Sequence, residues 1–579
     1  MVSKLMKYLG EYKKYLVLCV VFAFGEVICE LLIPLMMSHI VDIGIPEQNL
    51  GYIASIGGIM VLMSAAAIGF GVANAKISSE ASQGFGANIR KAMFAQIEQF
   101  SFANIDKFSS ASLVTRMTND VNQMQGAIMM TMRLLTRAPL MLISALVIAV
   151  SINAKLSLSI FVAIAIFVVI IPIIMRTAGK LFSNMQKKLD ALNGTVQENL
   201  IAIRVVKAFV RAGYEKTKFK KSNDELMEAA MKAGNLMAVT MPLMMLAMNG
   251  TTLAVIWIGG GYVGAGAMGT GELMSFISYI TQILMSVMMF SMIFVMLTRA
   301  RASAGRILEV LSTVPTIQDS PAVETRRKAA VRQGQVEFRD VSFRYSETGG
   351  DVLSHVSFAA QPGQMVGIVG GTGSGKTSLV NLIPRFYDAT GGEILVDGVN
   401  VKDYTQEDLR DGIGMVMQSN NLFSGTIRDN ILWGKEDATA DEVVQAATDA
   451  QAHDFISSFP NGYETDLGQG GVNVSGGQKQ RLCIARAMLK KPAILILDDS
   501  TSAVDMATEA KIRQSFTRNF KDSTVIIVAQ RISSVKDADQ IIVLDDGVVA
   551  GIGTHDELLE SNDIYREICS SQLEGGLAQ

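Results

Sequence analysis

Cysteine and histidine are scarce in this chain of 579 residues, which carries four of each. The cysteines lie far apart, at Cys19, Cys29, Cys483 and Cys569, and no pair has the C-x-x-C spacing. A disulfide framework or a zinc site needs cysteines at short, regular spacings, so neither is indicated. The formal net charge of −3 at pH 7 argues against nucleic acid as a main partner.

Charged residues are also few, at 18%, whereas hydrophobic residues make up 49%. Each of six long apolar runs is about long enough to cross a hydrocarbon core of ~30 Å as a helix. These runs are Tyr15–Met37, Tyr52–Ala75, Ala127–Ile152, Leu156–Met175, Met237–Tyr262 and Leu273–Leu297. The first run is long and lacks a small-residue cleavage pattern, which favours a retained membrane anchor over a signal peptide. We expect a transmembrane domain over residues 1–300, embedded in a lipid bilayer.

The connections between these runs alternate in length and charge. Three short connections contain a single basic residue, Lys155, and two long ones are rich in Lys and Arg. The short connections are Val41–Gly51, Asn153–Lys155 and Val263–Glu272. The long ones are Lys76–Gly126 and Arg176–Leu236. By the positive-inside rule, the long intervals and both chain termini are predicted to be cytoplasmic.

Both long intervals have a helical pattern, so we expect paired helices that continue past the bilayer. Turn-like stretches at Ser109–Asp120 and Val206–Glu215 mark the predicted tips of these extensions. Each tip is predicted to be a short helix that docks on a cytoplasmic domain. A solvated bend is the alternative for each.

Four charged residues lie inside or beside the apolar runs. Glu26 and Glu30 are one helical turn apart, and so are Arg133 and Arg137. Glu26 and Arg137 both lie about 16 residues, or ~24 Å, from the predicted outer ends of their helices. An unpaired charge is costly in a membrane, so either a mutual ion pair or contact with substrate is expected.

Methionine is abundant, with 34 residues in the chain and clusters at Met241–Met248 and Leu284–Leu297. Flexible thioethers suit a cavity that accepts many apolar shapes. Methionine is also ordinary filler in membrane helices, and both interpretations stay open.

The composition changes after residue 300. The stretch Arg299–Gln335 is charged and contains Pro315 and Pro321, which predicts a linker over residues 301–335. From Val336, short β-type runs alternate with helical patterns, which predicts an α/β domain over residues 336–579.

A glycine-rich loop and an acidic strand end identify a nucleotide site in this second domain. The loop Gly370-Gly371-Thr372-Gly373-Ser374-Gly375-Lys376-Thr377 matches G-x-x-x-x-G-K-[ST], after the strand-like Met365–Val369 and before the helix-like Ser378–Phe386. Its backbone N–H groups cradle phosphates, with Lys376 on the β- and γ-phosphates. The apolar run Ala493–Leu497 ends in Asp498 and Asp499. Thr377 and Asp498 are the expected Mg²⁺ ligands.

These motifs resemble those of an ABC exporter half-transporter of the type IV, multidrug-exporter architecture, over essentially the whole chain. The loop resembles the Walker A motif, and Ile494–Asp498 resembles the Walker B strand. Further matches are Tyr345 (A-loop), Gln418 (Q-loop), Ser475-Gly476-Gly477-Gln478 (signature) and Ser502-Ala503-Val504-Asp505 (D-loop). The two cytoplasmic tips match the family's coupling helices.

The resemblance implies an all-α six-helix transmembrane domain, then an α/β P-loop ATPase domain with an antiparallel β subdomain and a helical subdomain. It also implies ATP and Mg²⁺ binding, with Gln418 as a further metal ligand. The residues implied to contact ATP are 370–378, Tyr345, the signature residues 475–478 and Asp505. Each ATP lies between the Walker motifs of one subunit and the signature of another. The implied protein is a multi-pass exporter of small amphipathic compounds in the plasma membrane.

Two positions depart from the family pattern. The catalytic Glu is replaced by Asp499, whose shorter carboxylate would fall short by about 1 Å, a misplacement that can cost ~10²-fold in rate. The switch histidine is replaced by Gln530, which cannot shuttle a proton near neutral pH. With Gln418, these are the candidate catalytic residues. We expect this chain to hydrolyse ATP poorly and to complete a competent site on a partner that carries Glu and His.

Other interpretations remain. A homodimeric exporter, an ATP-gated channel or sensor, and an exporter of one defined lipid, peptide or metal conjugate all share these motifs. The sequence contains no Cys/His-rich tract and no peptidase domain before the first apolar run, which weakly disfavours metal export and peptide processing. Six membrane runs exclude a soluble ABC ATPase that acts on DNA.

Overall fold

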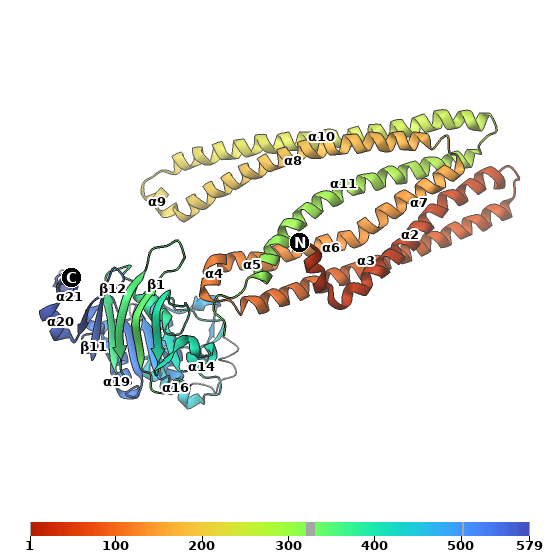
Figure 1. The fold of residues 1–579 in the computed structure, drawn as a ribbon. Helices are drawn as coiled ribbons and strands as arrows, with labels where there is room; N and C mark the ends of the chain where they lie inside the picture. The colour runs from red at the N-terminus through yellow and green to blue at the C-terminus, as the bar shows by residue number, and fades with distance from the viewer. Residues whose placement is uncertain (1, 320–329, 501–502, 578–579) are drawn as a thin grey trace. The chain divides into compact units, whose positions relative to one another are not determined.

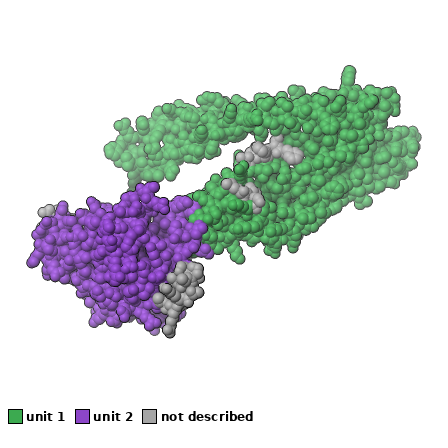
Figure 2. All heavy atoms as spheres, in the orientation of Figure 1, with its two compact units in different colours: residues 1–98, 110–313 green, residues 99–109, 314–579 purple. Residues whose placement is uncertain are grey.

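The computed structural model describes residues 2–319, 330–500 and 503–577. The chain divides into two compact units, coloured separately in Figure 2. The first comprises residues 1–98 and 110–313, and the second comprises residues 99–109 and 314–579. A short segment from the middle of the helical region therefore belongs to the second unit.

The first unit is helical, as predicted. In its described part, six stretches are long and apolar enough to cross a membrane: Met6–Gly44, Leu50–Ile97, Ser110–Ile152, Leu158–Ile201, Ala212–Gly264 and Thr270–Met289. Its α-helices (Figure 1) are α1 (Val2–Leu5), α2 (Lys13–His39), α3 (Leu50–Ile97), α5 (Ser110–Thr115), α6 (Val121–Met130), α7 (Thr136–Ile152), α8 (Leu158–Ile201), α9 (Ile203–Ala208), α10 (Ala212–Gly264) and α11 (Thr270–Ser312). Short 3₁₀ or π segments interrupt them at η1 (Met6–Tyr12), η2 (Ile40–Gly44), η3 (Arg116–Asp120) and η4 (Thr131–Leu135).

Apolar side chains cover much of the surface of this unit. Val61 and Leu246 are 69% and 71% exposed, and Trp257 is 86% exposed. In water such a surface would be unstable, whereas in a bilayer it faces lipid and the helices satisfy their backbone groups internally. A smaller apolar core includes Phe276 and Tyr279, whose hydroxyl donates to the carbonyl oxygen of Leu31 at 2.7 Å.

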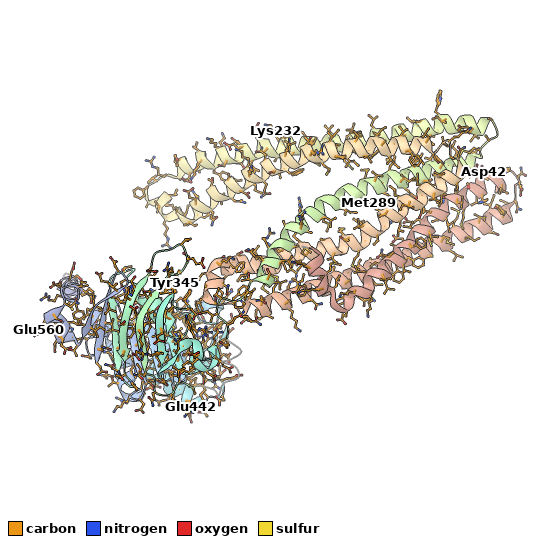
Figure 3. The ribbon with its side chains drawn as sticks, in the orientation of Figure 1. Asp42, Lys232, Met289, Tyr345, Glu442 and Glu560 are labelled. Carbon is orange, nitrogen blue, oxygen red and sulfur yellow. The ribbon has the colours of Figure 1, made fainter. Side chains whose placement is uncertain are left out.

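Polar contacts hold specific helices together. Asp42, labelled in Figure 3, accepts hydrogen bonds from the backbone N–H groups of Gly271 (2.6 Å) and Glu272 (2.9 Å) and so caps the start of α11. Deeper in the bundle, Arg137 on α7 forms ion pairs with Glu26 (2.9 Å) and Glu30 (2.7 Å) on α2. Of the two alternatives that the sequence left open for these charges, the mutual ion pair is therefore present.

Helix α11 is longer than its apolar run. It extends to Ser312, so the first residues of the predicted linker are helical. Arg306 in this extension binds Asp120 with a two-pronged contact, with Nε to Oδ2 at 2.7 Å. Residues 320–329, which include Pro321, lie outside the described residues.

The second unit contains three sheets among its described residues. Its strands are β1 (Val336–Phe343), β2 (Leu353–Ala360), β3 (Met365–Gly370), β4 (Gly391–Val396), β5 (Val399–Asn400), β6 (Ile413–Val416), β7 (Gly425–Thr426), β8 (Asp466–Leu467), β9 (Ile494–Asp498), β10 (Thr524–Val528), β11 (Gln540–Asp545) and β12 (Val548–Gly553). An antiparallel sheet has the order β2-β1-β4-β5, and a six-stranded sheet has the order β12-β11-β3-β10-β9-β6. In the larger sheet β11, β3, β10, β9 and β6 are parallel, and β12 is antiparallel at the edge.

Helices complete this unit. They are α4 (Phe102–Phe108), α13 (Lys376–Leu382), α14 (Gln406–Asp411), α15 (Ile427–Leu432), α16 (Ala440–Asp449), α17 (His453–Ser458), α18 (Gly476–Leu489), α19 (Met506–Asn519), α20 (His555–Ser561) and α21 (Asp563–Leu577). Helices α15, α16 and α18 pack on one another around Ile431, Val443 and Ile484, which are buried. The predicted α/β domain with antiparallel and helical subdomains is confirmed.

Helix α4 packs inside the second unit, although the chain before residue 99 and after residue 109 belongs to the first. Ser101 and Asn104 form a capping box that fixes its start. Phe102 stacks on Phe386 with ring centroids 4.3 Å apart, and the hydroxyl of Tyr387 donates to Asp106 at 2.7 Å. Residues 99–109 therefore form the segment that docks on the rest of the second unit.

The docking tip that we predicted at Ser109–Asp120 lies too late in the sequence. Residues 110–120 form α5 and η3, which belong to the first unit, and only Ser109 belongs to the second. Apolar periodicity continues through both segments, so it did not reveal the break at residue 109, where the backbone has a φ of +56°. The second predicted tip, Val206–Glu215, contains the end of α9 and the start of α10. Its side chains Phe209 and Val210 are exposed.

Candidate nucleotide-binding site

The carboxyl edge of the six-stranded sheet gathers the predicted nucleotide residues. The glycine-rich loop follows β3, Asp498 ends β9, and Gln418 and Gln530 follow β6 and β10. These strands are parallel, so their ends meet at one edge, where α/β sheets bind ligands. A cavity of about 490 Å³ is lined there by residues 370–378, Gln418, Asp498, Asp499 and Gln530.

The glycine-rich loop has a backbone that other residues would not adopt. Gly375 has a φ of +92°, and a Cβ there would lie 2.8 Å from the carbonyl oxygen of Val352. Lys376 opens α13, and its ammonium donates to the carbonyl oxygens of Gly370 (2.9 Å) and Gly371 (2.6 Å). Burial lowers the pKa of Lys376, and the charges of Asp499 and Asp498 oppose that shift. The cationic end is thus held at the loop where phosphates would bind.

Thr377 and Asp498 lie together, as expected for a Mg²⁺ site. The Thr377 hydroxyl donates to Asp498 Oδ1 at 3.1 Å, and Asp498 is 2% exposed. Burial raises the pKa of Asp498, and the Thr377 hydrogen bond opposes the rise. No cluster of three acidic, Cys or His residues that could hold a metal occurs among the described residues. A hydroxyl, one carboxylate and Gln418 suit an ion that takes its remaining ligands from phosphate and water.

The two residues that depart from the family pattern contact each other. Gln530 Nε2 donates to Asp499 Oδ2 at 2.8 Å. Asp499 has a φ of +47°, a left-handed backbone that Asp adopts more readily than most residues. Burial raises the pKa of Asp499, against the charges of Lys376 and Arg531. One carboxylate oxygen of Asp499 therefore already accepts a hydrogen bond from the neutral amide of Gln530.

Tyr345 (Figure 3) lies just after β1 and does not line the cavity itself within the described part of the chain. Its ring packs edge-on against Phe343 (4.8 Å) and Tyr387 (5.1 Å), and its hydroxyl shares a 2.8 Å hydrogen bond with the Ser378 hydroxyl. The ring is half exposed, so its outer part is available for stacking on a base.

The signature residues do not reach this cavity. Ser475 and Gln478 cap the start of α18 with a reciprocal pair of hydrogen bonds, and Ser475 and Gly476 are exposed. A Cβ on Gly477 would lie 2.8 Å from the carbonyl oxygen of Ala503, so only glycine fits. Of the residues that the structure describes, none from 475 to 478 lines the cavity.

Asp505, the last residue of the predicted D-loop, also lies outside the cavity. Asp505 caps α19 by accepting from the backbone N–H of Thr508 at 2.9 Å, and it does not line the cavity in the described structure. That hydrogen bond lowers the pKa of Asp505. Ser502 lies outside the described residues.

The C-terminal helix α21 contributes residues that the sequence did not reveal. Ile568 and Gln572 line the nucleotide cavity. Gln572 donates to the carbonyl oxygen of Gln530 at 2.7 Å and accepts from the backbone N–H of Ile532 at 2.9 Å. No motif marks these positions, because their role depends on α21 folding back against the segment after β10. The side chain fixes the backbone on both sides of Arg531.

Comparisons with known proteins agree with this geometry. Residues 16–287 match the model of the ABC transporter transmembrane region, and residues 353–502 match the ABC transporter model. The chain is 41% identical to the ABC transporter ATP-binding protein YfiB of Bacillus subtilis, over 99% of this chain and 98% of that protein. It is 34% identical to the putative multidrug export ATP-binding/permease protein YgaD of the same species, over 84% and 83%.

A solved structure also resembles the whole chain. A bacterial Atm1-family ABC exporter with ATP bound matches with a TM-score of 0.81 and 25% identity, over 97% of this chain and 99% of that one. The similarity covers both units, and not the nucleotide-binding unit alone.

Proposed function

The chain belongs to the ABC transporter family, with the transmembrane and ATP-binding domains of an exporter half-transporter, and we propose that it is the degenerate-site subunit of a heterodimer. Its own Walker site binds ATP–Mg²⁺ and hydrolyses it slowly. Its signature motif completes the competent site of a second half-transporter. The pair exports small amphipathic compounds across the plasma membrane, with both termini of this chain in the cytoplasm.

The hydrogen bond from Gln530 to Asp499 carries this proposal. Hydrolysis requires a group that orients and deprotonates the attacking water at the γ-phosphate. Here the shortened carboxylate already accepts a hydrogen bond from the Gln530 amide, and that amide cannot act as an acid or base near neutral pH. Of the four histidines, none lines the described cavity.

The position of the signature supports a requirement for a second subunit. Ser475 and Gly476 are exposed at the start of α18, whose N–H groups and partial positive charge suit a phosphate from outside this chain's cavity. The motif has the family's Ser-Gly-Gly-Gln pattern, in contrast to positions 499 and 530. The chain thus retains what a partner's site needs while its own site is altered.

The proposed substrate class comes from the surface of the first unit and from a relative. Met241 and Met245 on α10 are exposed, beside Leu246 and Leu243. Thioether and leucine side chains adapt to apolar ligands of different shape. YgaD, which is 34% identical, is named as a putative multidrug exporter.

ATPase measurements on reconstituted protein test the proposal. The chain alone is expected to hydrolyse ATP slowly, and addition of a half-transporter with Glu and His at the positions of Asp499 and Gln530 is expected to raise turnover by about 10²-fold. Lys376→Ala is the control, because it removes the lysine that is expected to contact the ATP phosphates in this chain's own site. Rapid turnover and pumping by this chain alone would show instead that it works as a homodimer.

A further inference from the structure

A cavity inside the first unit, lined by four charged residues among apolar ones, is separate from the nucleotide site. It has a volume of about 420 Å³ and is lined by residues of α2, α3, η4 and α7. Two pairs of charged side chains line it, and the members of each pair are one helical turn apart. Glu26 and Glu30 come from α2, and Arg133 and Arg137 come from η4 and α7. A volume of this size suits a small ligand or the head group of a lipid.

One side chain in this cavity has an unfilled hydrogen-bonding group. Asn74 on α3 lines the cavity and is 3% exposed, yet its Oδ1 accepts no hydrogen bond from any residue that the structure describes. A buried polar atom without a partner costs about 1–3 kcal/mol, and buried groups of this kind are nearly always satisfied. An N–H or O–H donor from a molecule bound in the cavity would satisfy this atom.

The charges of the cavity are unevenly paired. Glu26 and Glu30 share Arg137, which leaves that triad one negative charge in excess. Arg133 lines the same cavity and forms no ion pair within the described residues. It lies in the π segment η4, a local distortion that is common at functional sites. Among the residues that the structure describes, the cavity thus offers an unpaired cation beside a net negative cluster and an unfilled acceptor.

We propose that this cavity binds a zwitterionic lipid head group in which a phosphate lies beside a primary ammonium. The phosphate would contact Arg133, and the ammonium would donate to Asn74 Oδ1 and approach the Glu26–Glu30 pair. Phosphatidylethanolamine has this chemistry. Phosphatidylcholine lacks the N–H donors, and phosphatidylglycerol lacks the positive charge.

The depth of the cavity favours a lipid over a soluble zwitterion. Glu26 and Arg137 lie about 16 residues, or ~24 Å, from the outer helix ends near Asp42 and Asn153. Across a hydrocarbon core of ~30 Å, this places them near the inner head groups if the termini are cytoplasmic. The lipid assignment adds a ligand to the proposed export function. It depends on that proposal only for the orientation of the chain in the membrane, with both termini in the cytoplasm.

Lipid binding to the purified full-length chain in detergent tests the proposal without ATP or transport. Native mass spectrometry is used to compare phosphatidylethanolamine, phosphatidylcholine and phosphatidylglycerol with identical acyl chains. We expect the first to bind at least about tenfold more tightly, as one satisfied charge-assisted hydrogen bond would provide. Equal binding of the three lipids by the unaltered chain would overturn the proposal, and that comparison needs no variant.

Variants then locate the site. Asn74→Leu is expected to remove the preference for phosphatidylethanolamine. Arg133→Gln is expected to weaken the binding of all three lipids, because each carries the phosphate that Arg133 would contact, while Arg133→Lys keeps the affinity. Arg176→Gln, an exposed arginine on α8 outside the cavity, is the matched control. A preference that persists in Asn74→Leu, or unchanged affinity for all three lipids in Arg133→Gln, would overturn the assignment.

Soluble phosphoethanolamine distinguishes the two possible sources of the head group. We expect it to bind at least about tenfold more weakly than the lipid, because it buries no acyl chains. Equal affinity would overturn the lipid assignment. Lipid binding that survives while ATP-driven transport is absent would instead count against the proposed export function.

Discussion

Gln530 Nε2 lies 2.8 Å from Asp499 Oδ2, and this hydrogen bond joins the two positions at which the nucleotide site departs from its family pattern. One substitution shortens the acid, and the other supplies an amide that binds it. The two changes are therefore structurally coupled. The amide donates to one oxygen of the shortened acid, and this contact supports the slowly hydrolysing site that we propose.

Asp499→Asn is expected to change the turnover of the assembled transporter little. The Asn carboxamide oxygen still accepts the hydrogen bond from Gln530, so the local structure is kept while the negative charge is lost. Replacement of the partner's catalytic Glu by Gln should lower turnover by about 10²–10⁴-fold, because general-base catalysis at that site is lost. Steady-state ATPase assays compare the two variants. If Asp499→Asn stops hydrolysis, Asp499 is catalytic.

Arg137→Met is expected to destabilise the first unit. It leaves Glu26 and Glu30 with uncompensated negative charges at membrane depth, a loss of up to about 3 kcal/mol. Thermal unfolding in detergent measures the effect. Lys232→Ala is the control: Lys232 (Figure 3) pairs with Glu228 at 2.7 Å on the exposed surface of α10, and such pairs contribute little. Similar melting temperatures for both variants would contradict a structural role of the triad.

Phe102→Ala is expected to weaken the docking of α4 without altering nucleotide affinity. The stacked pair of Phe102 and Phe386 contributes about 0.5–1.5 kcal/mol, and neither residue lines the nucleotide cavity of the described structure. Substrate-stimulated ATPase activity and transport should fall, while binding of a fluorescent ATP analogue is unchanged. Phe182→Ala, an exposed aromatic residue on α8, is the control. Unchanged stimulation in Phe102→Ala would show that this contact does not transmit substrate binding.

Gln572→Ala is expected to loosen the segment that carries Gln530. The variant removes the acceptor of the Ile532 N–H and the donor to the Gln530 carbonyl oxygen. Loss of one such hydrogen bond, about 1 kcal/mol, should speed amide hydrogen exchange at Ile532 by up to roughly tenfold. Ser570→Ala, two residues earlier and exposed on α21, should leave exchange unchanged. Equal exchange in both variants would mean that α21 does not hold this segment.

The sequence by itself determined the architecture and the chemistry of the nucleotide site. Six apolar runs of membrane length left few alternatives to a helical bundle, because backbone groups in lipid must be satisfied within each segment. The glycine-rich loop and Asp498 were recognisable because phosphate and Mg²⁺ binding require those residue types at those spacings. Local patterns of this kind act over a few residues, so the chain order displays them directly.

Only the tertiary structure decided which distant residues meet. Equal depth permitted contact between Glu26 and Arg137, but rotation of each helix about its axis set the pairing, and apolar periodicity did not specify that rotation. The position of α4 was missed by about ten residues, because its docking depends on Phe386 and Tyr387, far away in sequence. The contact of Gln572 with the backbone near Gln530 has the same origin. Such contacts depend on how elements pack across the fold, and that information is spread over the whole chain.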